Sequence, residues 1–323
     1  MPTLKEHENY MLLLKGEMPE YVPRSGGNWG VGFTGLAPGP GGQEDFFDPF
    51  GVPYVVSAHA NNGALPKPGV FILDDIRRWR DVIKRPKILD EYDYERMAMR
   101  SLEAHNPEFP KSGGGSIGNG YFEMLVAFMG FTNGLIACLE EPEEVKALLN
   151  FILNINLEIG AKAIDYFRPD IYGMGDDIAH ERAPFVSLET FEDIFEPVWR
   201  ATVKPYKEAG CYAQHHNCGN FTPFVKHIVD MGFNAWNPAE PCSDLMWVKE
   251  TFGRKIAMCG GFDGNGFVSW PETTEEEIRA YVRQVCDQLA PGGGYAFGGG
   301  IMGYPERNEW VMDEFEKIRY SYY

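Results

Sequence analysis

Residues 211–220, Cys-Tyr-Ala-Gln-His-His-Asn-Cys-Gly-Asn, join a short strand pattern to a glycine turn, so polar side chains emerge where a strand ends. Within this stretch His216 and Cys218 form a His-x-Cys pair. Because they are two positions apart on extended backbone, their side chains face the same way. Imidazole nitrogen beside thiolate sulfur suits zinc better than calcium or magnesium. For the pair taken alone, the alternative is a buried cysteine beside a hydrogen-bonded histidine.

On either side of this strand, helical and strand patterns alternate from about residue 140 onward. A helix is expected from Pro142, and Thr274 with Glu277 forms a capping box that begins another. Short apolar runs predict strands at residues 170–174, 233–237, 255–259 and 295–297. This order implies a parallel sheet, and its regularity favours a closed barrel. We therefore predict an α/β protein in which residues 1–323 form a single (β/α)8 TIM barrel domain.

Residues 1–120 follow a less regular pattern than the rest of the chain. They hold two glycine-rich stretches, at 25–42 and 112–120, and a polar loop at 59–68. We expect the first strands here, joined by extended N-terminal loops. Residues 25–68 and 112–121 are predicted to lie over the C-terminal mouth of the barrel.

Composition excludes several classes of partner. The 323 residues carry a formal net charge of −18, which would repel nucleic acid and anionic membranes. The six cysteines include no C-x-x-C pair, and the first residues are too polar for a signal peptide. No run approaches the roughly 18 consecutive apolar residues of a membrane span. We therefore expect a cytoplasmic protein with reduced thiols that binds neither nucleic acid nor membrane.

The predicted strand ends are rich in polar side chains. In a parallel barrel these ends meet at one mouth, where active sites lie. Each residue also has a structural alternative, since an aspartate can cap a turn, a free cysteine can fill the core, and glycines 298–300 can form a bare turn. The polar residues are Asp176, Asp177, His215, His216, Cys218, Asn237, Glu240, Cys259 and Asp263.

Six segments spread over nearly the whole chain resemble the uroporphyrinogen decarboxylase superfamily. The segments are NYMLLLKGEMPEYVP at 9–23, GYFE at 120–123, GDD at 175–177, HNCG at 216–219, GGFD at 260–263 and GGGI at 298–301. Within the superfamily, the chain is more similar to the corrinoid-dependent methyltransferases. The decarboxylases carry an arginine-rich segment after the first strand and a G-H-G-I histidine after the last. The equivalent stretches here, RSGGNWG at 24–30 and GGGI at 298–301, hold one arginine and no histidine.

The resemblance also implies a metal site. The zinc-dependent methyltransferases of the superfamily use a His-x-Cys pair and a distant cysteine near the last strand. His216 and Cys218 match the pair, whereas a glycine, Gly299, takes the place of the distant cysteine. Either another group completes the site or it holds no metal. The candidates are Asp177, Glu181 and Cys259, of which we take Cys259, with His216 and Cys218, as the expected zinc ligands.

The related enzymes move a methyl group between a small molecule and the cobalt of a corrinoid (cobalamin) carried on a separate protein. A thiol, a methylamine or an aryl methyl ether is the donor or acceptor implied. The missing cysteine disfavours a thiol, and aromatic residues in the N-terminal loops suit a flat substrate. We therefore expect methyltransferase I of an anaerobic O-demethylase system, acting on a methoxylated aromatic. The aromatic residues are Trp29, Phe33, Phe46, Phe47, Tyr54, Tyr121 and Phe122.

This assignment gives the polar residues their expected roles. His215, His216 and Asp177 are expected to be catalytic because they would assist the departing oxygen. The alternatives are a methylcobalamin:thiol methyltransferase, a divergent decarboxylase-like enzyme, and a non-enzymatic corrinoid or tetrapyrrole binder. A homodimer is a possible assembly. Substrate contacts are expected from Trp29, Tyr121, Asn237 and Asp263.

Overall fold

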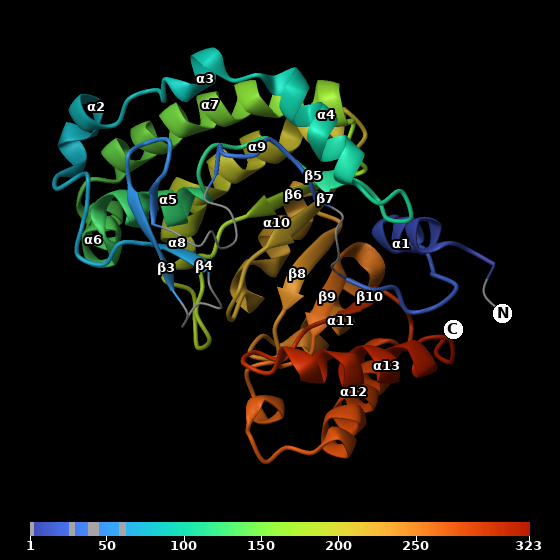
Figure 1. Cartoon of the computed structure of the whole chain (residues 1–323). Helices are drawn as coiled ribbons and strands as arrows, with labels where there is room; N and C mark the ends of the chain where they lie inside the picture. Colours follow the sequence, from blue (N-terminus) through green and yellow to red (C-terminus); the bar gives the residue numbers. More distant parts are fainter. Residues whose placement is uncertain (1–2, 26–29, 38–44, 58–62) are drawn as a thin grey trace.

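The central sheet consists of parallel strands that follow one another in chain order. The computed structural model describes residues 3–25, 30–37, 45–57 and 63–323. Within them the sheet has seven strands, in the order β1-β5-β6-β7-β8-β9-β10. It curls, with helices packed against its outer face (Figure 1). The strands are β1 (Gly30–Val31), β5 (Ser112–Gly113), β6 (Ile171–Gly175), β7 (Tyr212–His216), β8 (Ala235–Ala239), β9 (Ala257–Gly261) and β10 (Tyr295–Gly298).

The segment before β1 joins the two edges of this sheet. Arg24 forms a parallel bridge with Phe297 of β10, and the Ser25 N–H donates to the Phe297 carbonyl at 2.7 Å. A few residues later, β1 pairs with β5 at the opposite edge. Residues 24 and 25 thus pair with the edge strand β10, and residues 30 and 31 form the other edge strand, β1. The predicted α/β barrel architecture is confirmed, and the four predicted strands begin zero to two residues later than expected.

The helices form where the sequence supplies caps and apolar faces. Helix α7 begins at Pro142, as predicted, and buries Val145, Leu148 and Ile152. The expected capping box of Thr274 and Glu277 begins α12, with the Thr274 N–H donating to Glu277 Oε2 at 2.8 Å. The helices are α1 (Glu6–Leu14), α2 (Trp79–Val82), α3 (Ile88–Glu91), α4 (Tyr94–Ala104), α5 (Tyr121–Met129), α6 (Phe131–Glu140), α7 (Pro142–Phe167), α8 (Leu188–Thr190), α9 (Glu196–Glu208), α10 (Val225–Met231), α11 (Leu245–Phe252), α12 (Glu275–Leu289) and α13 (Asn308–Ile318).

Helix α7 is long and apolar enough, by length and composition, to cross a membrane. Half of its most apolar window is nevertheless buried inside the protein. Its buried residues pack into the same hydrophobic clusters as the neighbouring helices and loops. These contacts are those of a core helix, in which the apolar face is covered by protein.

The N-terminal third contains more regular structure than the sequence predicted. A second, antiparallel sheet has the order β2-β3-β4, with β2 at Phe46–Phe47, β3 at Pro53–Ser57 and β4 at Gly63–Pro66. Its strands are too short to show an alternating pattern in the sequence, which explains why we expected the first strands and long loops in this region but no second sheet. The sheet lies beside α5 and α6, to one side of the barrel strands (Figure 1).

Helix α1 closes the N-terminal end of the barrel. Its Tyr10 is fully buried in a cluster with small residues of the strands, including Ala235, Ala257 and Ala296. The small side chains leave room for the tyrosine ring. Its hydroxyl donates to Gln214 Oε1 of β7 at 3.0 Å and lies 3.4 Å from the Cys259 Sγ of β9.

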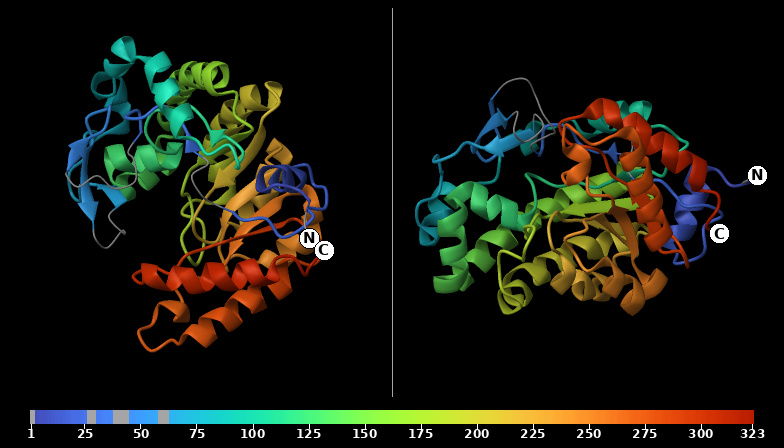
Figure 2. Two further views of the ribbon diagram at one scale, coloured as in Figure 1. Left: turned by 45° about the vertical axis from the view of Figure 1, so that its right-hand side comes forward. Right: turned by 90° about the horizontal axis from the view of Figure 1, so that it is seen from below.

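The two ends of the chain lie side by side (Figure 2). Arg319, which is 1% exposed, binds both carboxylate oxygens of Glu6 at 2.8 and 2.9 Å and donates to the Val22 carbonyl at 3.0 Å. The buried guanidinium thus ties α1 to the end of α13.

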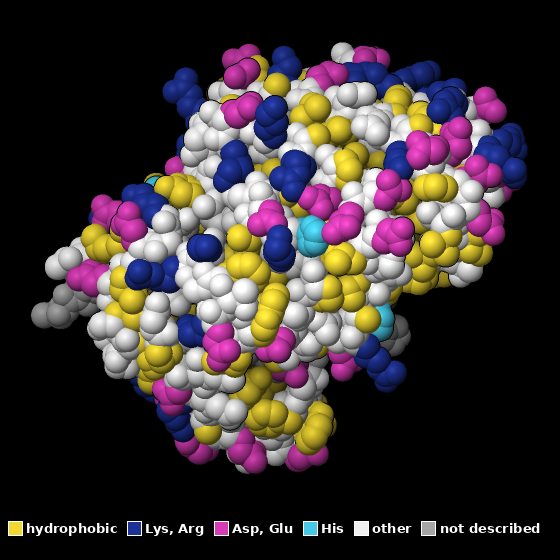
Figure 3. Space-filling view, turned by 180° about the vertical axis from the view of Figure 1, so that it is seen from behind, with side chains coloured by type: hydrophobic (Ala, Val, Ile, Leu, Met, Phe, Trp, Pro, Cys, Tyr) yellow, Lys and Arg dark blue, Asp and Glu magenta, His cyan; other side chains and the backbone are white. Residues whose placement is uncertain are grey.

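On the face seen in Figure 3, acidic and basic side chains are interspersed, so the net negative charge does not form a patch of one sign there.

We expect Tyr10→Ala to lower the free energy of unfolding by about 3–5 kcal/mol, because it empties a ring-sized volume inside the barrel. Tyr10→Phe keeps the ring and removes the hydroxyl bonded to Gln214, so it should cost only about 1 kcal/mol. Urea unfolding followed by circular dichroism measures both. Equal losses in the two variants would contradict the packing role of the ring.

Candidate functional site

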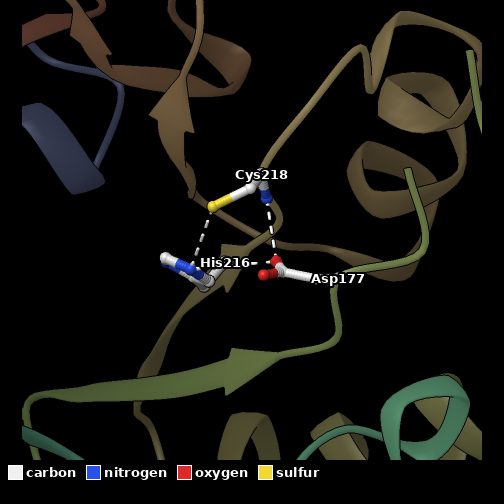
Figure 4. A group of neighbouring side chains, drawn as sticks. All are labelled: Asp177, His216 and Cys218. Carbon is white, nitrogen blue, oxygen red and sulfur yellow. Dashed lines mark hydrogen bonds and ion pairs between the residues drawn. The ribbon is translucent and has the colours of Figure 1, made fainter. Parts of the chain in front are cut away.

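Three potential metal ligands converge at the C-terminal ends of β6 and β7 (Figure 4). His216 is the last residue of β7, Cys218 follows two residues later, and Asp177 lies two residues beyond β6. His216 Nε2 is 3.7 Å from Cys218 Sγ and 3.8 Å from Asp177 Oδ1. All three ligand atoms lie within 4.8 Å of one another. Nitrogen, sulfur and oxygen at this spacing match the donor set of a catalytic zinc site with an open position.

The backbone around these residues holds the group together. The Cys218 N–H donates to Asp177 Oδ1 at 2.8 Å, so the turn after β7 fixes the carboxylate. Gly219 has a φ of +87°, and a Cβ there would lie 2.8 Å from backbone atoms of Ala179 and His180. Only glycine therefore allows the two loops to approach so closely.

The charge around Cys218 disfavours the free thiolate. Burial raises the pKa of its thiol well above the usual range, and the negative charges of Asp177 and Glu240 raise it further. A divalent cation would act in the opposite direction, because it stabilises the thiolate form. The chemistry of the three donors thus fits a bound cation.

Asp176, the neighbour of Asp177, has a structural role. Its fully buried carboxylate accepts from the Phe122 N–H at 3.0 Å, the Glu123 N–H at 3.2 Å and the Trp199 indole N–H at 2.9 Å. It therefore caps the first turn of α5 from a different part of the chain. Burial, followed by the charge of Glu123, raises the pKa of Asp176 to about 8. Asp176 thus has a capping role, but at a helix that precedes it in the chain and not at the turn that follows it.

His215 does not join the expected catalytic group. Alternation along β7 turns it to the opposite side from His216, where it is fully buried. The centroid of its ring lies 4.4 Å from the ring centroid of Trp199 and 5.1 Å from that of Phe221. Burial, followed by the nearby His216, lowers its pKa to about 3, so the ring is neutral. Neither ring nitrogen has a hydrogen-bond partner among the described residues.

A cavity of about 370 Å³ adjoins two of the three candidate ligands, Asp177 and His216, whereas Cys218 lines a neighbouring cavity of about 500 Å³. The 370 Å³ cavity is bounded by the loop at 114–121 and the inner side of β6, and both Asp177 and His216 line it. Tyr121, an expected substrate residue, lines it too, and its hydroxyl lies 2.6 Å from Thr202 Oγ1. The volume suits a small organic ligand.

Glu123 also lines this cavity, although sequence reasoning gave it no role. It follows Gly120 by three positions, and its Oε2 accepts from the Gly120 N–H at 3.2 Å. This capping-box spacing was the available signal. Burial, followed by the charge of Asp177, raises the pKa of Glu123 to about 7.

The other expected substrate residues lie elsewhere. Asn237 lines a cavity of about 280 Å³, and Asp263 lines another of about 500 Å³, which Cys218 also lines. Asp263 Oδ1 accepts from the N–H groups of Asn265 and Gly266 at 3.0 and 2.8 Å, which makes it a turn-forming residue. Trp29 lies outside the described residues.

Most of the aromatic residues expected over the mouth pack against protein instead. Phe46 stacks on Tyr54 at 5.3 Å, Phe33 lies 4.9 Å from Phe167, and Phe122 stacks on Phe185 at 5.5 Å. Phe47 is 73% exposed. Within the described part of the chain, Tyr121 is the one member of the expected set that lines the 370 Å³ cavity. The rings therefore mainly fasten loops to the barrel.

The sequence model of the uroporphyrinogen decarboxylase (URO-D) family matches residues 65–315. The chain belongs to this family. Among solved structures, a methyltransferase from Methanosarcina mazei is similar at a TM-score of 0.68 and 15% identity, over 98% of this chain and 99% of that one. This likeness shows a shared fold. No curated protein sequence is significantly similar to the chain.

The structure of this URO-D family member explains why the third ligand is not found near the last strand. Gly299 has a φ of +152°, and a Cβ there would lie 2.8 Å from the Phe262 Cβ. A cysteine side chain does not fit this backbone. Cys259, the ligand we expected, is 1% exposed and forms a hydrogen bond with the Tyr10 hydroxyl. It is absent from the converging group. Asp177 is the third member of the converging group.

We expect stability to fall as pH rises from about 4 to about 8. The folded-state pKa of Asp176, about 8, exceeds the ordinary value, so the folded protein keeps a proton that the unfolded chain releases in this range. Asp176→Asn cannot ionise and should lose less stability over the same range. Its absolute stability should still be lower by about 1–3 kcal/mol, because an amide cannot accept all the bonds. Urea unfolding at several pH values measures both, and identical pH profiles would contradict the assignment.

Proposed function

We propose that the chain is a corrinoid-dependent methyltransferase. In this proposal it moves a methyl group from an aryl methyl ether to the cob(I)alamin of a separate corrinoid protein in the cytoplasm. The observation that carries the proposal is the convergence of Asp177, His216 and Cys218 beside a cavity at the barrel mouth. The fold shared with the Methanosarcina mazei methyltransferase supports it.

The charge of the cavity argues against decarboxylation of a tetrapyrrole that carries several carboxylates. The described residues that line it include Glu123 and Asp177 but no lysine or arginine. A polyanionic substrate would be repelled and would lack charged hydrogen-bond donors. The single arginine in residues 24–30 points in the same direction.

In the proposed reaction, the carbon–oxygen bond of the ether breaks and its electron pair stays on oxygen. The cobalt electron pair forms the new bond to the methyl carbon, and the phenolate takes a proton from water. Asp177, His216 and Cys218 would hold zinc, which supplies a Lewis acid for the departing oxygen. The cavity walls hold the ether so that its methyl carbon faces the open mouth. Tyr121 is a rigid part of these walls, because Thr202 and Asn156 contact its hydroxyl.

A methylated ammonium donor is a second candidate. The carboxylates of Glu123 and Asp177 lie along the cavity and would attract a cation. The reaction would otherwise have the same form, with an amine as the group that departs from the methyl carbon.

The metal can be tested without any substrate. Protein purified without chelator should contain zinc, measured by elemental analysis, and His216→Ala and Asp177→Ala should lose it. Cys259→Ala is the control, because this cysteine lies outside the converging ligand group and should leave the zinc content unchanged. Zinc lost in Cys259→Ala but kept in Asp177→Ala would contradict the ligand set.

The reaction can be tested with a reduced corrinoid protein and a panel of methoxylated aromatics. The cob(I)alamin spectrum should convert to that of methylcobalamin, with release of a phenol. His216→Ala and Asp177→Ala should slow the conversion about 10²-fold or more, the scale expected for loss of a leaving-group contact. His227→Ala is the control, because this histidine pairs with Glu196 on α9. No conversion with any ether, together with ready demethylation of methylcobalamin by a thiol, would overturn the proposal in favour of a thiol methyltransferase.

A further inference from the structure

Strand β6 presents bare backbone to the cavity beside His216. Gly173 and Gly175 are exposed, whereas Tyr172 before them and Met174 between them are buried, and all four residues line the 370 Å³ cavity. Glycine inside a strand weakens it, because there is no side chain to pack. Two glycines on one face of a strand therefore call for a physical reason.

Packing within the protein does not supply that reason. A Cβ at Gly173 would have Ser112 Oγ, at 3.8 Å, as its sole neighbour within 4 Å in the described part of the chain. A Cβ at Gly175 would meet only the His216 side chain there, at 3.7 Å or more. Neither residue has a positive φ. By contrast, a Cβ at Gly115 would lie 2.6 Å from the Ile159 carbonyl oxygen. The fold itself would tolerate a side chain at either position. Close approach of a ligand to the β6 backbone therefore accounts for the absence of side chains there.

The charges at the cavity restrict what this ligand can be. Glu123 and Asp177 line it, and no lysine or arginine does so among the described residues. A divalent cation held by Asp177, His216 and Cys218 would be balanced by the carboxylate and the thiolate. Glu123 adds a further carboxyl group that no lysine or arginine among the described lining residues offsets. A carboxylate on the ligand would therefore face repulsion in a partly enclosed, weakly screened space.

We propose that the methyl donor is a flat, uncharged or positively charged methyl ether that lies across the backbone of Gly173 and Gly175, and that ethers bearing a carboxylate are excluded. This inference rests on the proposed function and names its substrate class. A planar ring can lie in van der Waals contact with a strand from which no side chain projects. Its methoxy group then reaches toward His216, which lies level with Gly175 in the pairing of β6 and β7.

Three probes of matched shape test the charge preference: 3-methoxybenzamide, 3-methoxybenzylamine and 3-methoxybenzoate. Isothermal titration calorimetry with the zinc-loaded protein measures their dissociation constants. The benzoate should bind about tenfold more weakly than the amide, or worse, and the amine at least as tightly as the amide. Glu123→Gln should narrow the difference between the dissociation constants of the benzoate and the amide. Glu181→Gln is the control, because it removes a carboxylate that lines the neighbouring 500 Å³ cavity. It should leave the difference between the dissociation constants of the benzoate and the amide unchanged.

Graded substitutions test the place of binding. Gly173→Ala and Gly173→Val should weaken binding of the amide progressively, the valine variant by about tenfold or more, as the side chain takes up ring space. Their unfolding midpoints should stay unchanged or rise, because the added atoms meet open space. Gly32→Ala is the matched control, since its nearest neighbour would be 4.0 Å away and it does not line the cavity.

Benzoate bound as tightly as the amide, or full binding by folded Gly173→Val, would overturn this inference. Failure of all three probes to bind would overturn it as well. The proposed function has a separate readout, which is methylcobalamin formation from any methyl ether. A carboxylated ether that binds and converts cob(I)alamin to methylcobalamin would leave the proposed function standing and refute the charge preference alone.

Discussion

The buried carboxylate of Asp176 organises the mouth of this barrel. It accepts hydrogen bonds from the first turn of α5 and from Trp199 on α9, and so joins the end of β6 to two helices. Gly120 permits this approach, because a Cβ there would lie 2.3 Å from the Asp176 carboxylate. Once Asp176 is fixed, the next residue, Asp177, projects toward His216 and Cys218, and Glu123 is held on the cavity wall. The arrangement of the site thus follows from an interaction that takes no part in chemistry.

The periodicity of the sequence was sufficient to predict the barrel and one side of the site. Strand and helix alternation gave the order of the parallel sheet, because each βα unit is a local pattern. The period of two along β7, continued for two residues past its end at His216, placed His216 and Cys218 on the same side. The same period required His215 to face the other way, into the ring of Trp199. Our expectation of a catalytic His215 failed because it relied on position at a strand end and did not apply the alternation to each residue.

Contacts between distant segments could not be predicted from such patterns. Asp177, Glu181 and Cys259 were the candidates for the third ligand, and no local pattern showed that Cys259, the one we chose, would lie apart from His216 and Cys218. Whether Cys259 can be a ligand depends on where Tyr10 of α1 enters the barrel, because the Tyr10 ring occupies the space beside Cys259. Likewise, the loop aromatics were equally suited to line a cavity or to fasten loops. Stacking partners such as Phe185, far along the chain, decide the outcome for Phe122.

The ligand set has a consequence for the proposed chemistry. A site with two cysteines and one histidine, as the resemblance implies for the thiol-activating enzymes, is soft and rich in negative sulfur. Replacement of one thiolate by the Asp177 carboxylate leaves a harder donor set, because carboxylate oxygen gives up less electron density than sulfur. A divalent cation held this way would be a better acceptor for oxygen. Within the proposed function, the steric exclusion of a side chain at Gly299 and the placing of Asp177 by Asp176 together favour an oxygen leaving group over a sulfur nucleophile.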